Sequence, residues 1–171
     1  MSYYISCVIM NDDTKLLKKI FERDGIPEKS TLNKLIVEAC TQQQSEIVKI
    51  LVEYGADVNF IDEFGNTPLH ESVMNCTEEC IVALLDCGAN INIISGSTNK
   101  ATPLHYAVGN RNKELVELLL ERGADKNIKD GKSRTPADLL KYDNEPRYKK
   151  LFEYINNFEC MDIKEPYSEE N

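Results

Sequence analysis

The 171-residue chain has no long uninterrupted apolar run. A membrane-spanning helix needs about 20 predominantly apolar residues, so no membrane association is expected. Residues 1–10 also lack the basic segment and the small-residue cleavage site of a secretory signal peptide. We therefore expect one small, elongated domain in the cytoplasm, with the nucleus as a second location.

Positive charge is scarce. The sequence contains 20 Lys and Arg residues against 29 Asp and Glu residues, which gives a formal net charge of −9. Nucleic-acid affinity depends largely on Lys and Arg side chains that neutralise phosphates, so nucleic acid is not expected as a partner. This charge balance favours another protein as the partner.

Motifs of catalysis and metal binding are absent from the sequence. No nucleophile elbow, phosphate-binding loop, zinc-protease helix or nicotinamide fingerprint occurs. The closest cysteines, Cys76 and Cys80, do not form the Cys-x-x-Cys pair typical of structural zinc sites. We expect no enzymatic activity, no cofactor and no metal. Most of the six cysteines are interpreted as small apolar residues of the interior, with a reactive thiol as the alternative.

A repeat is the most informative feature that the sequence does contain. The tetrapeptide Thr-Pro-Leu-His at 67–70 returns at 102–105 and, altered to Thr-Pro-Ala-Asp, at 135–138. A second marker, Gly-Ala, begins at Gly55, Gly88 and Gly123. Because the two markers recur together every thirty-odd residues, the chain consists of stacked structural units.

Each unit carries the signals of two short helices. Thr67 suits the N-cap of the first helix and Pro68 its first position. A second helix is expected from about Thr77, with apolar residues at helical spacing, and Gly88 ends it. Neither helix can bury an apolar face alone, so neighbouring units must supply the core.

A unit of this length that opens with Thr-Pro-Leu-His resembles the ankyrin repeat. The resemblance implies an all-α solenoid of about five stacked helix-turn-helix units with β-hairpin connectors. The family's usual glycine late in the first helix is replaced by Gln43, Cys76 and Arg111, which suggests a distorted turn. The expected parts are an N-terminal cap at 1–28, a degenerate repeat at 29–61, repeats at 62–96 and 97–129, a C-terminal cap at 130–160 and an acidic disordered tail at 161–171.

The resemblance also assigns roles to individual residues. His70 and His105 are expected to join a connector to a helix start by hydrogen bonds rather than to catalyse or bind metal. Partners of ankyrin repeats usually bind the concave face, where connector tips act as fingers and first helices as a palm. Ser30, Thr31 and Asn33 would form the finger of the degenerate repeat. The expected partner-binding residues are Glu63, Phe64, Asn66, Met74, Asn75, Thr98, Asn99, Asn110, Lys132, Arg134, Lys141 and Tyr142.

Two of these expectations have alternatives. Phe64 is either an exposed anchor for a partner or a ring folded back on the neighbouring finger. The cluster of Lys141, Arg147, Lys149 and Lys150 is either a solvated helix face or a docking site for an acidic segment.

The function expected from the resemblance is that of a monomeric, non-catalytic protein-protein interaction module, acting as an adaptor or inhibitor. One alternative is a host modulator encoded by a virus or microbe that imitates inhibitors of the NF-κB transcription factors. Another is a structural scaffold whose surface serves self-assembly.

Overall fold

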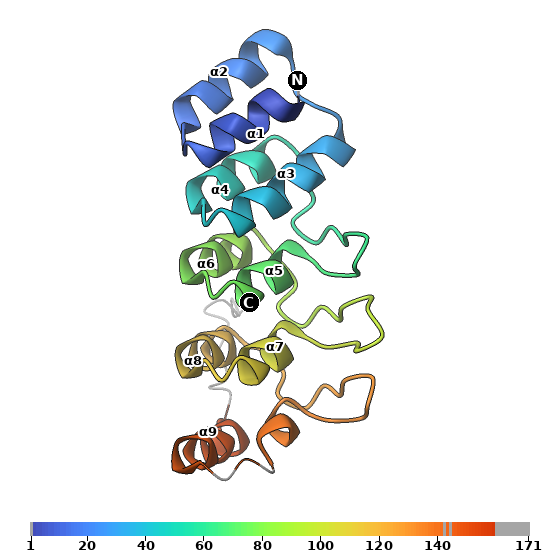
Figure 1. The fold of residues 1–171 in the computed structure, drawn as a ribbon, viewed down its shortest axis with the longest axis vertical. Helices are drawn as coiled ribbons and strands as arrows, with labels where there is room; N and C mark the ends of the chain where they lie inside the picture. The colour runs from blue at the N-terminus through green and yellow to red at the C-terminus, as the bar shows by residue number, and fades with distance from the viewer. Residues whose placement is uncertain (1, 142, 144, 160–171) are drawn as a thin grey trace, which may run out of the picture.

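The computed structural model describes residues 2–141, 143 and 145–159 of the chain. Its helices form an elongated stack of pairs, as Figure 1 shows. The helices are α1 Ser2–Met10, α2 Thr14–Asp24, α3 Lys29–Thr41, α4 Ser45–Glu53, α5 Pro68–Met74, α6 Glu78–Asp86, α7 Pro103–Gly109, α8 Lys113–Glu121, the 3-10 helix η1 Ala137–Leu140 and α9 Pro146–Asn157. No strand occurs within the ranges described, and the protein is an all-α repeat solenoid.

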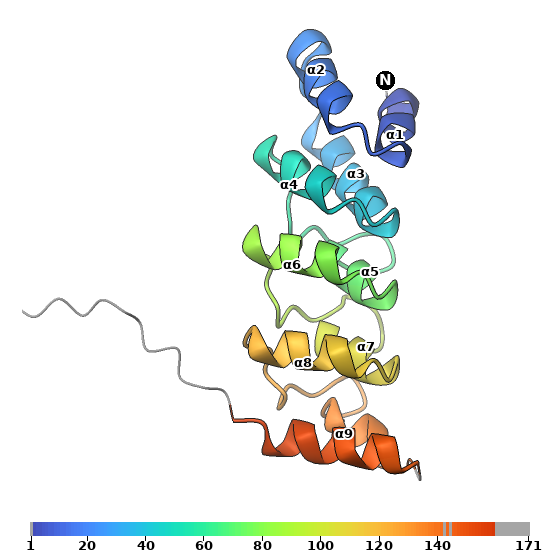
Figure 2. The ribbon, with the colours of Figure 1, turned by 90° about the vertical axis from the view of Figure 1, so that its left-hand side faces the viewer.

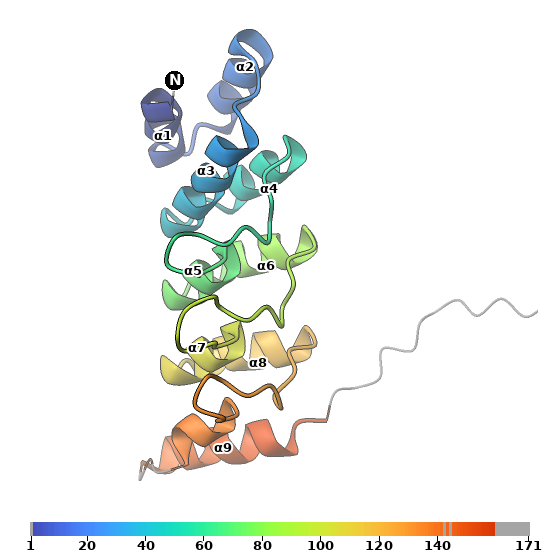
Figure 3. The same ribbon diagram turned by 90° about the vertical axis from the view of Figure 1, so that its right-hand side faces the viewer.

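The pairs are arranged in two columns. The first helices α1, α3, α5, α7 and η1 contact one another in succession, and the second helices α2, α4 and α6 do the same. Figures 2 and 3 show the two columns from opposite sides, and the connectors before α5, α7 and η1 project together from the stack in Figure 1. This arrangement gives the molecule a row of fingers beside the palm helices.

One continuous hydrophobic core runs through the stack, because every pair is too small to bury its apolar face alone. In α8, Leu115, Val116, Leu119 and Leu120 are buried on one side of the helix. The core extends from Ile5 in α1 to Ile155 in α9. Pro146 stands at the start of α9, where its missing N–H leaves no hydrogen bond unmade.

The turn between paired helices keeps the same geometry in spite of its missing glycine. Gln43, Cys76 and Arg111 all adopt positive φ, at 63°, 55° and 56°. Asp12 does so in the N-terminal cap as well, with φ of 52°. The expected distortion is thus confined to one left-handed residue per turn, a conformation that costs a non-glycine residue about 1–2 kcal/mol.

The finger expected for the degenerate repeat does not exist, and this prediction was wrong. Helix α3 already begins at Lys29, so Ser30, Thr31 and Asn33 lie within it. Asn33 is buried, and its Oδ1 accepts a hydrogen bond from the Asp57 N–H at 2.8 Å. The physical reason is that this segment lacks the Thr-Pro pair, which fixes the start of the first helix in the later units.

The β-hairpin character of the connectors is not confirmed. In the described chain they are tight turns, such as that closed by the hydrogen bond from the Asp62 N–H to the Asn66 carbonyl at 2.8 Å. Cysteine burial also differs in part from expectation. Cys40 and Cys80 are buried as expected, whereas Cys76 is exposed because it occupies the left-handed turn position. The expected acidic tail at 161–171 lies outside the described residues.

Candidate functional site

Three fingers project beside the palm: the first finger, residues 62–66, the second finger, residues 95–101, and the third finger, residues 130–134. An acidic side chain organises the first and third. Asp62 Oδ1 accepts hydrogen bonds from the N–H groups of Phe64 and Asn66, at 2.9 and 2.8 Å. Asp130 Oδ1 does the same for the third finger. Side chains of this length stabilise tight turns by capping the backbone two residues on.

The second finger, two residues longer, is organised by Ser95 instead. Its Oγ accepts a hydrogen bond from the Ala101 N–H at 3.2 Å and lies 2.9 Å from Ser97 Oγ. The Ser95 N–H itself donates to the Ala101 carbonyl at 2.9 Å. The extra length is therefore accommodated without loss of the closing contact.

Adjacent fingers are joined by backbone hydrogen bonds. The Gly96 N–H donates to the Gly65 carbonyl, and the Gly131 N–H donates to the Asn99 carbonyl, each at 2.7 Å. Gly65 has φ of +83°, and a Cβ there would lie 2.5 Å from the Ser97 nitrogen. A Cβ at Gly131 would meet the second finger at 2.6 Å. The three fingers therefore form one continuous rim that only glycine at these contacts allows.

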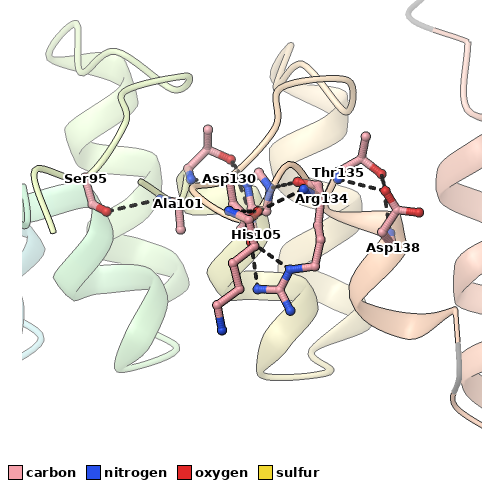
Figure 4. A network of polar contacts seen from close by, with 9 residues as sticks. Ser95, Ala101, His105, Asp130, Arg134, Thr135 and Asp138 are labelled. Atoms are coloured by element: carbon pink, nitrogen blue, oxygen red, sulfur yellow. Dashed lines mark hydrogen bonds and ion pairs between the residues drawn. The ribbon is translucent and has the colours of Figure 1, made fainter. Parts of the chain in front are cut away.

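The two histidines join each palm helix to the following finger, which confirms the role that the resemblance implied. The Thr67 N–H lies 3.3 Å from His70 Nδ1, while His70 Nε2 lies 3.1 Å from the Ala101 carbonyl. His105 repeats this arrangement, with Nε2 3.0 Å from the Arg134 carbonyl (Figure 4). A neutral imidazole with its proton on Nε2 satisfies both contacts. Burial lowers the pKa of His70 to about 4 and also lowers that of His105.

In the last unit Asp138 takes the place of histidine. Its Oδ2 accepts hydrogen bonds from the N–H and Oγ1–H of Thr135, at 2.9 and 2.8 Å (Figure 4). These bonds lower the pKa of Asp138. The carboxylate thus holds Thr135, just before η1, and requires no following finger.

A first hollow lies between α3 and the first finger. It has a volume of about 420 Å³ and is lined by Lys34, Val37, Phe60, Asp62, Glu63 and Phe64. The Phe64 side chain is 71% exposed, which excludes the alternative of a ring folded back on the neighbouring finger. Two predicted residues, Glu63 and Phe64, therefore lie together, and the hollow adds Lys34, Val37 and Phe60, which the prediction missed.

A second hollow lies between the second and third fingers above α7. It has a volume of about 230 Å³, and the structure brings four predicted residues to it. They are Asn99, Asn110, Lys132 and Arg134. Tyr106 also lines the hollow and was not predicted. Its place one residue after the repeating Thr-Pro-Leu-His could have indicated it.

Charges at the second hollow are unequally neutralised. Arg134 Nη2 and Nε lie 2.7 and 3.0 Å from Asp130 Oδ2. Burial acts to raise the pKa of Asp130, but Arg134 and the finger N–H groups lower it to about 2. Lys132 is exposed and, among the residues described, forms no ion pair. The uncompensated positive charge of this hollow therefore comes from Lys132.

Other predicted residues lie apart from the two hollows. Met74 is half-buried and Asn75 exposed at the end of α5, and Thr98 is exposed on the second finger. Asn66 turns toward α5, where its Nδ2 donates to Glu71 Oε1 at 3.2 Å. Lys141 is exposed beyond η1, and Tyr142 lies outside the described residues.

The C-terminal basic cluster is partly engaged within the chain. Arg147 pairs with Glu145 at 2.7 Å and lies over the Tyr148 ring, 4.5 Å from its centroid. Lys149 and Lys150 are exposed on α9. For Arg147 these contacts support the solvated-face alternative over the docking one.

In the described part of the chain, no group of three or more His, Cys, Asp and Glu residues is arranged to hold a metal ion. None of the helices described combines the length and the apolar character needed to cross a bilayer.

Comparison with known proteins identifies the family. A family model described as "Ankyrin repeats (3 copies)" matches residues 6–96 and residues 35–130. The chain belongs to the ankyrin-repeat family. The ankyrin repeats make it a protein-protein interaction module, and the family is typically non-enzymatic.

Three relatives illustrate the range of proteins with similar repeats. Ankyrin repeat and SOCS box protein 16 of Homo sapiens is 36% identical over 63 residues, covering 37% of this chain and 14% of that protein. Ankyrin repeat protein FPV243 of fowlpox virus is 44% identical over 46 residues, covering 27% and 18%. BCL-6 corepressor-like protein 1 of Homo sapiens is 38% identical over 64 residues, covering 37% and 4%. The matched stretches thus span less than a fifth of each relative.

Proposed function

We propose that this ankyrin-repeat protein is a non-catalytic binding module that holds a partner protein across its fingers and palm. The observation that carries the proposal is the exposed Phe64 ring at the edge of the first hollow. Binding energy at protein interfaces concentrates in a few aromatic and Arg anchors that fill well-packed positions. Phe64 has that character and stands at a fingertip.

The rigidity of the finger supports this role. Asp62 fixes the backbone on both sides of Phe64, and Gly65 joins the finger to its neighbour. A partner that covers Phe64 therefore orders little additional chain, which reduces the entropic cost of binding.

The test compares substitutions of exposed apolar residues on and off this surface. The partner is first identified by affinity purification from the native host with mass spectrometry, and its affinity is then measured by calorimetry with purified proteins. Phe64→Ala, alone and combined with Met74→Ala, should weaken binding by at least about 2 kcal/mol. Ile26→Ala is the matched control, since Ile26 is 56% exposed in the loop between α2 and α3.

Because Met74 is half-buried, thermal melts must accompany the double variant. The single Phe64→Ala variant provides the decisive measurement, since its ring contributes little to the stack. Unchanged affinity in a variant that melts like the parent would reject the concave face as the binding surface at this repeat.

Within this function, an adaptor or inhibitor role is the first candidate. Similarity to fowlpox virus ankyrin repeat proteins supports the alternative of a virus-encoded host modulator that imitates NF-κB inhibitors. Direct binding of a purified NF-κB subunit, abolished by Phe64→Ala, is the result expected from that alternative. Light scattering over a concentration range tests the monomer proposed here against a self-assembling scaffold.

A further inference from the structure

The two hollows occupy equivalent places two units apart. Each lies between a palm helix, α3 or α7, and the finger that follows it. Asp62 and Asp130 stand five residues before the Thr of their units, and Phe64 and Lys132 stand three residues before it. The same position of the scaffold thus presents an aromatic ring in one hollow and an ammonium group in the other.

The first hollow combines apolar walls with acidic groups. Val37, Phe60 and Phe64 supply the apolar surface. Glu63 is exposed, and Asp62 uses only Oδ1 to hold its finger, so Oδ2 remains able to accept a hydrogen bond. With Lys34 as its one cation, this hollow suits an apolar side chain beside a Lys or Arg.

The second hollow has the opposite character. The Asp130 carboxylate is fully engaged by Arg134 and by the finger backbone, so it does not repel an incoming anion strongly. Lys132 contributes an ammonium group that forms no ion pair with the residues described, and Asn99 and Asn110 line the same space. Asn110 Nδ2 already donates one hydrogen bond to the Val73 carbonyl, at 3.3 Å, and keeps a second N–H. A carboxylate can accept hydrogen bonds from the Lys132 ammonium, the Asn99 amide and this remaining N–H of Asn110.

The distance between the hollows sets the length of chain that can reach both. Helices in contact pack about 8–10 Å apart, so two units separate the hollows by roughly 20 Å. An extended peptide advances about 3.3 Å per residue and covers this distance in about six residues.

We propose, on the basis of the proposed function, that the partner presents an extended segment to both hollows. An apolar residue next to Lys or Arg occupies the first hollow, and Asp or Glu, about six residues away, occupies the second. The fingers between the hollows are joined to one another, so they form a continuous rim along which such a segment lies. Opposite charges at the two ends also fix the direction of the bound segment.

The test uses a random dodecapeptide display library selected on the immobilised full chain. Enriched peptides should carry the basic-apolar pair and the acidic residue at a spacing of about six residues. Selection on Lys132→Glu should lose only the acidic preference, and selection on Glu63→Lys only the basic one. Lys149→Glu, an exposed change on α9, is the control and should leave both preferences intact.

One enriched peptide is then measured by fluorescence anisotropy. Lys132→Glu should weaken its binding about tenfold or more, and replacing the peptide's acidic residue by Lys should restore binding to that variant. Circular dichroism melts verify that each variant folds.

Failures of the two proposals are distinguishable. One outcome is that Phe64→Ala abolishes peptide binding while Lys in place of the peptide's acidic residue fails to restore binding to Lys132→Glu. In that case the surface binds a partner and the inference about charge is wrong. If selection enriches no peptide, or only peptides without the charge pattern, the inference is also rejected. Binding that is insensitive to both Phe64→Ala and Lys132→Glu rejects the surface itself.

Discussion

Lowering the pH from 7 to 5 should destabilise the protein by about 2 kcal/mol through His70 alone. Burial lowers the pKa of this imidazole to about 4, against 6.5 for the exposed group. As the pH falls, the unfolded chain therefore binds a proton before the folded protein does. The stability contributed by neutral His70 is complete above pH 6.5 and is lost as the pH falls toward 4.

The magnitude follows from linkage between proton binding and folding. The full difference between the two pKa values corresponds to about 3 kcal/mol, of which about 2 kcal/mol is lost by pH 5. His105 acts in the same direction, because burial lowers its pKa as well. The Asp130 carboxylate, with a pKa of about 2, contributes stability that is lost only below pH 3.8 and so does not interfere.

The assay is urea unfolding followed by circular dichroism at pH 7 and pH 5 and at constant ionic strength. The comparison is with His70→Gln, whose amide does not titrate. The variant is less stable at pH 7, but its loss of stability between the two pH values should be smaller by about 2 kcal/mol. Glu71, whose pKa is raised by burial, is present in both proteins. An equal loss of stability in parent and variant would show that His70 is not buried in its neutral form.

Three further predictions concern stability, each measured as the change in unfolding free energy by urea titration. Leu119→Ala should cost about 3 kcal/mol, because its side chain is fully buried and truncation leaves a cavity; an unchanged midpoint would place Leu119 outside the core. Gly65→Ala should cost about 3 kcal/mol, but Gly88→Ala only about 1 kcal/mol, since both have positive φ and only Gly65 meets a neighbouring finger; equal costs would contradict the contact between fingers. Gln43→Gly should stabilise by about 0.5 kcal/mol by relieving a left-handed residue, and a loss would show that Gln43 is not strained.

The sequence predicted those elements whose determinants are local. Thr67 and Pro68 specify the start of α5 wherever the neighbouring units lie. Gly88, with its positive φ, ends α6 by an equally local signal. The start of α3 was missed because its repeat lacks that signature, although Pro27 shortly before Lys29 was a usable signal.

The candidate site was predictable only as a set of positions. Counting from the repeat placed Asn99, Asn110, Lys132 and Arg134 on one face. Their meeting in one hollow depends on how units about thirty residues apart superimpose, which local patterns do not contain. Neutralisation of Arg134 by Asp130, which leaves Lys132 as the uncompensated charge, likewise requires the folded third finger.

The hydrogen bonds of the two histidines affect the order in which the units fold. Each bond runs forward along the chain, from His70 to the carbonyl of Ala101 and from His105 to that of Arg134. During synthesis a unit therefore cannot complete its buried hydrogen bonds until the next finger has left the ribosome. Ordering of the nascent chain should lag about one repeat behind its elongation. Asp138 accepts its hydrogen bonds from Thr135 of its own unit, so this unit needs no later finger to complete them.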